Sequence, residues 1–291
     1  MEWVHDKAAM QARALDWRAH GKRIGFVPTM GALHAGHVSL VAIARPGCDV
    51  VAVSVFVNPL QFGPGEDFER YPRDLDGDAR LLAAAGCDLV FAPAAPDMVA
   101  GDARTMVEVQ GLQDTLCGRS RPGHFRGVAT VVAKLFHLVQ PAVAVFGQKD
   151  AQQAVLLRRM VRDLDFPVAM RIAPIVRHPD GLAMSSRNAY LSAAERCEAL
   201  LLHEGLAAAR AVVQGGGRDA RRVTAAARAV LQRGAHLCVD YVECVDPEDL
   251  RPRTTLAGRT LIAVAAFVGK TRLIDNLVLD IREDGVQDVA L

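Results

Sequence analysis

The sequence has almost no net charge, no closely spaced cysteines and no long apolar run, and each absence excludes a class of protein. Thirty-four Lys and Arg residues oppose 33 Asp and Glu residues, leaving a net charge of +1, so we expect no nucleic-acid partner. The six cysteines lie far apart without a Cys-x-x-Cys pair, which disfavours a disulfide scaffold or a zinc ribbon. Apolar stretches such as Leu261–Gly269 are much shorter than the roughly 20 residues of a membrane span. Glu2 and Lys7 lie where a secretory signal would be apolar, so these absences predict a cytoplasmic protein without a membrane partner.

Apolar residues make up 51% of the 291 residues, and they are arranged in short runs that alternate with helical periods. The short runs predict strands at Arg23–Pro28, Val50–Val57, Asp88–Ala92, Thr105–Val109, Ala142–Phe146 and Val168–Ile172. The helical periods predict helices at Lys7–His20, Gly36–Ala44, Asp74–Ala85, Gly127–Val139 and Ala151–Leu164. This alternation predicts an α/β fold with a doubly wound, Rossmann-like parallel sheet. Ligands bind such sheets at the carboxyl ends of the strands, where the strand order reverses.

The pattern changes in the last third of the chain, which predicts a smaller α+β domain. Two Ala- and Arg-rich helices are expected near Ala193–Val213 and Asp219–Arg233, followed by strands near Leu237–Val245, Thr260–Val268 and Ile274–Ile281. Turn residues such as Pro179 and Gly181 mark the boundary between the two patterns. We therefore expect a catalytic domain at residues 1–176 and a C-terminal lid domain at residues 177–291.

The densest cluster of candidate functional residues is the segment PTMGALHAGH, which runs from Pro28 to His37 and joins a predicted strand to a predicted helix. A helix amino terminus has unpaired N–H groups and about half a positive charge, so it attracts phosphate. His34 and His37 would share one side of the first turn, while Gly36 lets an anion approach the backbone. The alternatives are structural histidines or a metal pair, but a zinc site would need a third ligand and usually a nearby Glu, which this segment lacks. The segment therefore favours a phosphate site.

Two further clusters could add positive charge to such a site. The segment FGQKD follows a predicted strand and contains Lys149, which can reach phosphate oxygens as a point charge. A surface pair with Asp150 as a helix cap is the alternative. The segment GLAMSSRN places two hydroxyls and Arg187 in a turn-rich loop that could clamp a triphosphate. An ordinary interdomain linker is the alternative for this loop.

Polar residues at three other places are candidates for substrate or metal contacts. Asn58 and Gln61 follow the strand predicted at Val50–Val57, and their amides can bind hydroxyls and carboxylates. Arg121 and His124 lie in a cationic turn, which suits either anion docking or a surface loop. Asp78 is a candidate magnesium contact, and a solvated carboxylate in the first turn of a helix is the alternative.

Five segments together closely resemble the pantothenate synthetase (pantoate–β-alanine ligase) family. This family belongs to the nucleotidyltransferase group that shares a His-x-Gly-His motif with class I aminoacyl-tRNA synthetases. The segments are PTMGALHAGH, FVNPLQFG, RPGHFRGVATVV, FGQKDAQQ and GLAMSSRNAYL, in the family's order. The carboxyl-terminal third is similar in length and pattern more than in motif.

The resemblance implies a ligase of pantothenate biosynthesis that uses ATP, assisted by Mg²⁺, in two steps. Pantoate and ATP would form pantoyl adenylate and pyrophosphate, and the amine of β-alanine would then displace AMP to give pantothenate. The resemblance also implies a homodimer. Two alternatives stay open: a nucleotidyltransferase of the same superfamily, and a non-catalytic nucleotide-binding module.

Carried over by position, the resemblance assigns roles to residues of this sequence. His37 would be the proton donor, with His34, Lys149 and Arg187 as further catalytic groups. The ATP-binding residues would be Met30, Gly31, Ala32, Leu33, His34, Ala35, Gly36, His37, Gly147, Gln148, Lys149, Asp150, Val176, Met184, Ser185, Ser186 and Arg187. Gln61 and Gln153 would bind pantoate, with Gln61 also near β-alanine, and Asn58, Arg121 and His124 would be further substrate contacts. The sequence departs from the family at Gln148, where many members carry Glu, and at Cys117, where some members carry Glu.

Overall fold

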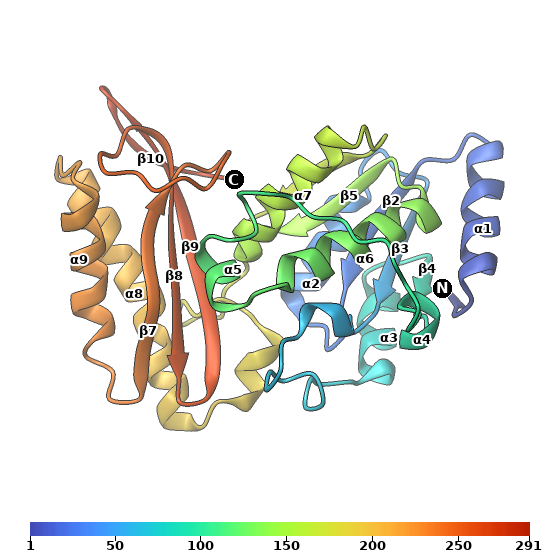
Figure 1. Ribbon diagram of the computed structural model, residues 1–291, viewed down its shortest axis with the longest axis horizontal. Coiled ribbons are helices and arrows are strands. Elements are labelled where there is room, and N and C mark those ends of the chain that lie inside the picture. Colours follow the sequence, from blue (N-terminus) through green and yellow to red (C-terminus); the bar gives the residue numbers. More distant parts are fainter. The chain divides into compact units, whose positions relative to one another are not determined.

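A parallel sheet of six strands forms the centre of the first of two units in the computed structural model, which describes residues 1–291 (Figure 1). The strands are β1 (Glu2–Val4), β2 (Ile24–Thr29), β3 (Val50–Val55), β4 (Leu89–Phe91), β5 (Val143–Gly147) and β6 (Ala169–Ala173), in the order β1-β4-β3-β2-β5-β6. After β1, the chain builds outward from β2 through β3 to β4, which pairs with β1. It then places β5 against the opposite edge of β2. The strand order therefore reverses between β2 and β5, which is where such sheets bind ligands.

Helices cover both faces of this sheet, so its strands are almost entirely apolar. On one face lie α2 (Ala35–Ala44) and α3 (Leu75–Ala84), whose Val41 and Leu82 share a core with valines of β2 to β5. On the other face α6 (His124–Val139) brings the ring of Phe136 to 6.4 Å from that of Phe146 in β5, and α1 (Lys7–Ala19) packs beside α6. The other helices before β6 are the short α4 (Ala95–Met98) and α5 (Leu116–Ser120) and the longer α7 (Ala151–Asp163).

The second unit is an antiparallel sheet of four strands with two helices on one face (Figure 1). The strands are β7 (Leu237–Val245), β8 (Gly258–Val268), β9 (Thr271–Arg282) and β10 (Gly285–Val289), in the order β10-β9-β8-β7. Helices α8 (Ala193–Gln214) and α9 (Ala220–Leu231) bury Leu202 and Val223 against the sheet. The amino terminus of α8 is capped by Ser192, whose hydroxyl accepts the N–H of Glu195 while the Glu195 carboxylate accepts the N–H of Ser192.

The two units interleave along the sequence. The first comprises Met1–Asp114, Arg121–Gly147 and Leu156–Ala173, and the second comprises Thr115–Ser120, Gln148–Val155 and Pro174–Leu291. None of the helices is both long and apolar enough to span a membrane.

The predicted fold class is confirmed, and the differences lie in short elements. The strand predicted at Thr105–Val109 is wrong: the segment is irregular, and the N–H of Val107 donates to the Thr130 hydroxyl, 2.9 Å away, instead of to a neighbouring strand. Its β-branched residues favour an extended strand, but a strand forms only where a neighbouring strand pairs with it. Two strands without a clear period in the sequence, β1 and β10, are edge strands of three and five residues and were not predicted.

Candidate functional site

The turn between β2 and α2 carries the two histidines, and their side chains cap the helix. His34 is the residue before the first turn of α2, and its Nδ1 accepts the N–H of Gly36 at 3.1 Å. The reciprocal bond comes from His37, whose Nδ1 accepts the N–H of His34 at 3.3 Å. The two rings lie 4.1 Å apart between centroids. The prediction that both histidines lie on one side of the first turn is therefore confirmed in geometry.

These capping bonds determine which nitrogen of each ring carries the proton. A neutral imidazole has one N–H and one acceptor nitrogen. Since Nδ1 accepts a backbone N–H in both rings, the proton of each neutral ring is on Nε2. In a neutral ring Nε2–H is therefore the hydrogen-bond donor, which is the type of group that a phosphate oxygen accepts.

Asp78 shapes the turn that precedes the histidines. Gly31 and Ala32 both have positive φ angles, 83° and 50°, a conformation that backbone contacts must stabilise in a residue such as alanine. Asp78 in α3 supplies them: its Oδ2 accepts the N–H of Ala32 at 3.0 Å and its Oδ1 accepts the N–H of Leu33 at 2.7 Å. Burial raises the pKa of Asp78, although these two hydrogen bonds act in the opposite direction. Its contact with a metal stays a prediction.

The candidates for pantoate binding in the first unit lie around Gln61, at the end of a short 3-10 helix, η1 (Pro59–Gln61). The buried Asn58 donates through Nδ2 to Oε1 of Gln61 (3.2 Å) and to the carbonyl of Gly127 (3.1 Å). Gln61 in turn donates through Nε2 to the sulfur of Met30, 3.0 Å away. A Cβ at Gly127 would lie 2.2 Å from the carbonyl oxygen of Leu60. Glycine at this position of α6 therefore allows η1 to approach. The bond to Met30 connects Gln61 with the turn that carries the histidines.

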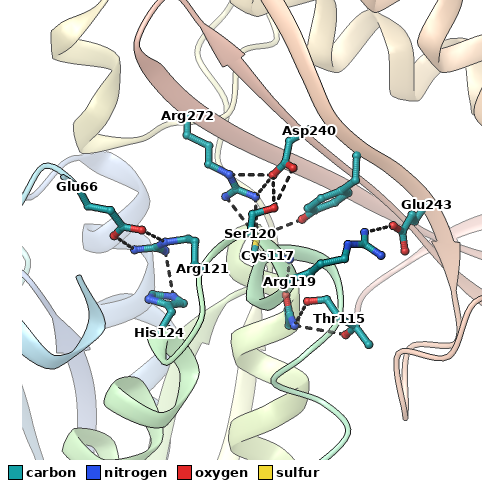
Figure 2. Close-up of polar contacts among 12 residues, drawn as sticks. Glu66, Thr115, Cys117, Arg119, Ser120, Arg121, His124, Asp240, Glu243 and Arg272 are labelled. Carbon is teal, nitrogen blue, oxygen red and sulfur yellow. Dashed lines mark hydrogen bonds and ion pairs between the residues drawn. The ribbon is translucent and has the colours of Figure 1, made fainter. Parts of the chain in front are cut away.

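Arg121 and His124 both bond to the backbone of Gln61, and Figure 2 shows Arg121 paired with Glu66 and His124. The imidazole of His124 donates from Nδ1 to the Gln61 carbonyl at 2.7 Å, and its Nε2 accepts from Nη1 of Arg121 at 3.1 Å. Arg121 also donates to the Gln61 carbonyl at 3.1 Å and forms a two-pronged ion pair with Glu66, at 2.7 and 2.6 Å. Burial alone would raise the pKa of Glu66, but the hydrogen bonds and charge of Arg121 outweigh it and lower that pKa. Direct substrate contacts by Arg121 and His124 stay predictions.

In the second unit, the segment after β5 forms another 3-10 helix, η2 (Gln148–Asp150), which bonds to β9. Asn276 donates through Nδ2 to the carbonyls of Gln148 (2.9 Å) and Lys149 (3.0 Å). The Gln148 side chain donates to Oδ1 of Asn276 at 3.3 Å and accepts the N–H of Leu291 at 3.2 Å. The amide of Gln148 is thus buried among protein groups. The Glu found at this position in many family members could not donate the hydrogen bond that Gln148 donates to Asn276, because an ionised carboxylate only accepts.

The second nucleotide segment of this unit is a hairpin followed by η3 (Ser186–Tyr190). Met184 donates its N–H to the Val176 carbonyl at 3.0 Å, so these two predicted ATP contacts are adjacent. The hydroxyl of Ser185 accepts the N–H of Arg187 at 3.3 Å and caps η3. Gln153 lies in the first turn of α7, three residues after Asp150. The convergence of Lys149 and Arg187 with the histidines stays a prediction.

Cys117, the other departure, lies in α5 of the second unit, outside all of these segments (Figure 2). Its sulfur is 3.1 Å from the Tyr241 hydroxyl and 3.5 Å from the guanidinium of Arg272, which also bonds Asp240 at 2.6 Å. Burial, and then the neighbouring thiol, raise the pKa of Tyr241. This network stabilises α5 against the four-stranded sheet.

Three groups of residues that shape the candidate site were not identified in the sequence: Glu66, Gly127 and the pair Asp275–Asn276. Glu66 lies in an irregular segment without a motif, and Gly127 lies in the segment RPGHFRGVATVV, which assigned it no role of its own. Asp275 and Asn276 did leave a signal, because two adjacent polar residues interrupt the apolar strand predicted at Ile274–Ile281. No group of three or more His, Cys, Asp or Glu side chains is arranged to hold a metal ion.

A doubly wound sheet with a His-x-Gly-His turn at its switch point defines an α/β enzyme of the nucleotide-binding class. A family model described as pantoate-beta-alanine ligase matches residues 2–278. The chain belongs to the pantoate–β-alanine ligase family, and it is a ligase that condenses pantoate with β-alanine using ATP.

Individual relatives and solved structures agree with this family. The chain is 52% identical over 281 residues to the pantothenate synthetase of Heliobacterium modesticaldum, covering 97% of this chain and all of that protein. It is 55% identical over 264 residues to that of Thermotoga neapolitana, covering 91% and 94%. The crystal structure of pantothenate synthetase from Thermus thermophilus is similar with a TM-score of 0.90 at 47% identity, covering 95% and 99%. The pantoate-beta-alanine ligase of Francisella tularensis, complexed with beta-gamma ATP and beta-alanine, has a TM-score of 0.78 at 32% identity, covering 95% and 97%.

Proposed function

We propose that this ligase works through an acyl adenylate. In the first step, a carboxylate oxygen of pantoate attacks the α-phosphorus of ATP, the bond to the bridging oxygen breaks, and pyrophosphate leaves. In the second step, the amine of β-alanine attacks the activated carbonyl, AMP leaves with the former carboxylate oxygen, and the amine loses a proton. The Francisella tularensis relative, whose structure contains an ATP analogue and β-alanine, supports both ligands for this chain.

One observation carries the adenylation step: the reciprocal capping bonds of His34 and His37. Because backbone N–H groups occupy Nδ1 of both rings, Nε2–H of each ring can donate to phosphate oxygens as negative charge moves onto the leaving pyrophosphate. In this proposal His37 is the proton donor, and Lys149 and Arg187 add positive charge that offsets the repulsion between a carboxylate and a triphosphate.

We assign pantoate to the polar groups around Gln61, with Gln153 as the second amide. The Gln61 side chain is held between Asn58 and Met30, so its amide is oriented before substrate arrives. Amides bind hydroxyls and a carboxylate without adding charge, which suits a substrate whose carboxylate must stay nucleophilic. β-Alanine then approaches the carbonyl beside Gln61.

Mg²⁺ fits this site as an ion carried in with ATP. Because Mg²⁺ usually keeps several waters and uses one or two carboxylates with substrate phosphates, it does not need the cluster of acidic side chains that the protein lacks. Asp78 is the carboxylate proposed as its protein contact, since each oxygen accepts one N–H and a carboxylate has about four acceptor positions. Bound there, Mg²⁺ would neutralise phosphate charge.

We also propose that residues 1–176 hold ATP and pantoate, that residues 177–291 act as a lid, and that the enzyme is a cytoplasmic homodimer. A lid would protect the adenylate from hydrolysis. All six cysteines are free thiols, which supports a reducing compartment.

An isotope experiment tests the adenylate route. Pantoate labelled with ¹⁸O in its carboxylate is incubated with ATP, Mg²⁺ and β-alanine, and AMP is examined by mass spectrometry. We expect one labelled oxygen in AMP and none in pyrophosphate. Label in inorganic phosphate, with ADP as the nucleotide product, would contradict the proposal. With β-alanine omitted, pantoyl adenylate should accumulate on the enzyme.

Gln61→Ala tests the assignment of pantoate to Gln61. This variant should weaken the binding of pantoate while leaving the affinity for ATP nearly unchanged.

A further inference from the structure

Two polar residues, Asp275 and Asn276, interrupt the apolar strand β9 of the second unit. Each is only 3% exposed. Burial of a carboxylate and an amide is unfavourable unless hydrogen bonds and charge partners satisfy them. Successive residues of a strand point to opposite faces of the sheet, so this pair presents one polar side chain to each face. The contacts of the two side chains show what the pair does.

Asn276 bonds the segment that contains Lys149. Its Nδ2 group donates to two successive carbonyls, those of Gln148 and Lys149, at 2.9 and 3.0 Å. Its Oδ1 accepts from the Gln148 side chain at 3.3 Å. Both hydrogens of one amide therefore fix the backbone from which the Lys149 side chain extends.

Asp275 bonds the hairpin that leads to Arg187. Its two oxygens pair with the guanidinium of Arg177, at 2.6 and 2.9 Å. Arg177 also donates to the Gly181 carbonyl at 3.1 Å and thereby closes the turn of the hairpin. Arg177 opposes Ala183 across this hairpin, next to the pair formed by Val176 and Met184. The Oδ1 atom of Asp275 accepts the N–H of Asn276 at 2.8 Å, so the carboxylate is also held by the backbone of β9.

We propose that Asp275 and Asn276 are positioning residues for ATP, which hold the Gln148–Asp150 and Val176–Arg187 segments in one fixed arrangement. The inference rests on the proposed role of these two segments in nucleotide binding. Neither side chain needs to contact the nucleotide, because each acts through a backbone or a guanidinium that it bonds. Since a shift of about 1 Å in a binding group can lower a rate a hundredfold, adjacent anchors on one rigid strand are an effective way to position two separate segments.

The test uses the full-length enzyme with two nearly isosteric variants, Asn276→Asp and Asp275→Asn. Asn276→Asp replaces the donor amide with an acceptor that faces two carbonyls, and Asp275→Asn removes the charge partner of Arg177. For each variant we expect the Kd for a non-hydrolysable ATP analogue and the KM for ATP to rise about tenfold, the effect of losing one or two such bonds. The KM values for pantoate and β-alanine should stay within about twofold of wild type.

The matched control is Asp280→Asn, on the same strand, whose carboxylate pairs with the exposed Arg282 at 2.8 Å. It should bind the ATP analogue like wild type. Unchanged ATP binding by Asp275→Asn, or an equal loss for all three substrates, would overturn the inference. Asp275→Asn decides the matter by itself if Asn276→Asp does not fold.

Lys149→Ala separates this inference from the proposed function. Normal adenylation by Lys149→Ala would show that the segment does not hold the nucleotide, and it would overturn both. A large loss in Lys149→Ala with wild-type ATP binding in the two β9 variants would overturn the positioning role alone.

Discussion

The turn after β2 and the turn after β5 follow neighbouring parallel strands, yet they are held in place by very different contacts. In the turn after β2, the capping bonds join residues two and three positions apart, Gly36 to His34 and His34 to His37. In the turn after β5, the carbonyls of Gln148 and Lys149 bond Asn276, about 128 positions later in the chain. The first turn is therefore organised largely by its own sequence, and the second depends on the antiparallel sheet.

This difference indicates how the two turns should respond to change. A locally capped turn forms as soon as its helix forms, since the bonding partners share one helical turn. A turn held by a distant strand forms only when that strand is in place. Substitutions in the first turn should therefore affect chemistry directly, while the second turn should also respond to substitutions far away in the sequence.

The largest expected effect comes from removing the chemistry of the locally capped turn. His37→Ala should lower the rate of adenylation by roughly a thousandfold, as expected when a partner of transition-state charge is lost. Pyrophosphate release with ATP and pantoate measures this rate. The control is His20→Ala, an exposed histidine beside Asp16, which should be fully active. Turnover by His37→Ala near that of wild type would refute its proposed role.

A smaller effect is expected from crowding the contact between α6 and η1, which orients Gln61. In Gly127→Ala the new methyl would lie 2.2 Å from the Leu60 carbonyl oxygen, so the backbone must move. We expect a loss of about 3 kcal/mol in the free energy of unfolding, measured by urea denaturation, with a raised KM for pantoate. Gly101→Ala, where nothing lies within 4 Å of the added carbon, is the control. A stable Gly127→Ala enzyme with a normal KM would show that this close approach is not needed.

Asp78→Asn tests how far the first turn depends on a distant residue, because Asp78 accepts two of its backbone N–H groups. The amide offers one acceptor atom for two backbone N–H groups, so one of them loses its partner. The expected loss is about 2 kcal/mol in the free energy of unfolding, together with reduced ATP binding. Asp76→Asn, exposed in the same first turn of α3, should change neither. Equal behaviour of the two variants would mean that local capping alone maintains the turn.

The smallest expected effect concerns the pH dependence of the Glu66–Arg121 pair. The folded-state pKa of Glu66 lies below its ordinary value of 4.5, so the pair stabilises the fold above about pH 4.5 and loses its contribution as the pH falls through the folded-state pKa. Glu66→Gln should therefore cost up to about 1 kcal/mol near pH 7 and progressively less in acid, measured by urea denaturation. Glu108→Gln, which removes an exposed partner of Arg126 at 3.5 Å, should show no such trend. A pH-independent cost for Glu66→Gln would argue against the ion pair.

Much of the fold could be predicted because its elements are periodic over ten or more residues. The helices α1, α2, α7 and α8 begin within a residue of their predicted positions. The errors fall on short segments: Thr105–Val109 has β-branched residues without a strand beside it, and β1 is three residues long. In such short segments the presence of a neighbouring strand, and not the amino-acid composition, determines whether a strand forms.

The motifs, their order along the chain and the local caps can be recognised in the amino-acid sequence, because the capping bonds join residues within one helical turn. The residues that support them become neighbours only in the folded chain: Asp78 for the turn of the histidines, Glu66 and Gly127 for Gln61, and Asp275–Asn276 for the segments of Lys149 and Arg187. The two groups of contacts differ because the second joins residues that are far apart along the chain. A hydrogen bond between residues 46, 55 or 128 positions apart leaves no period in the sequence, and it exists only after the unit that contains both residues has folded.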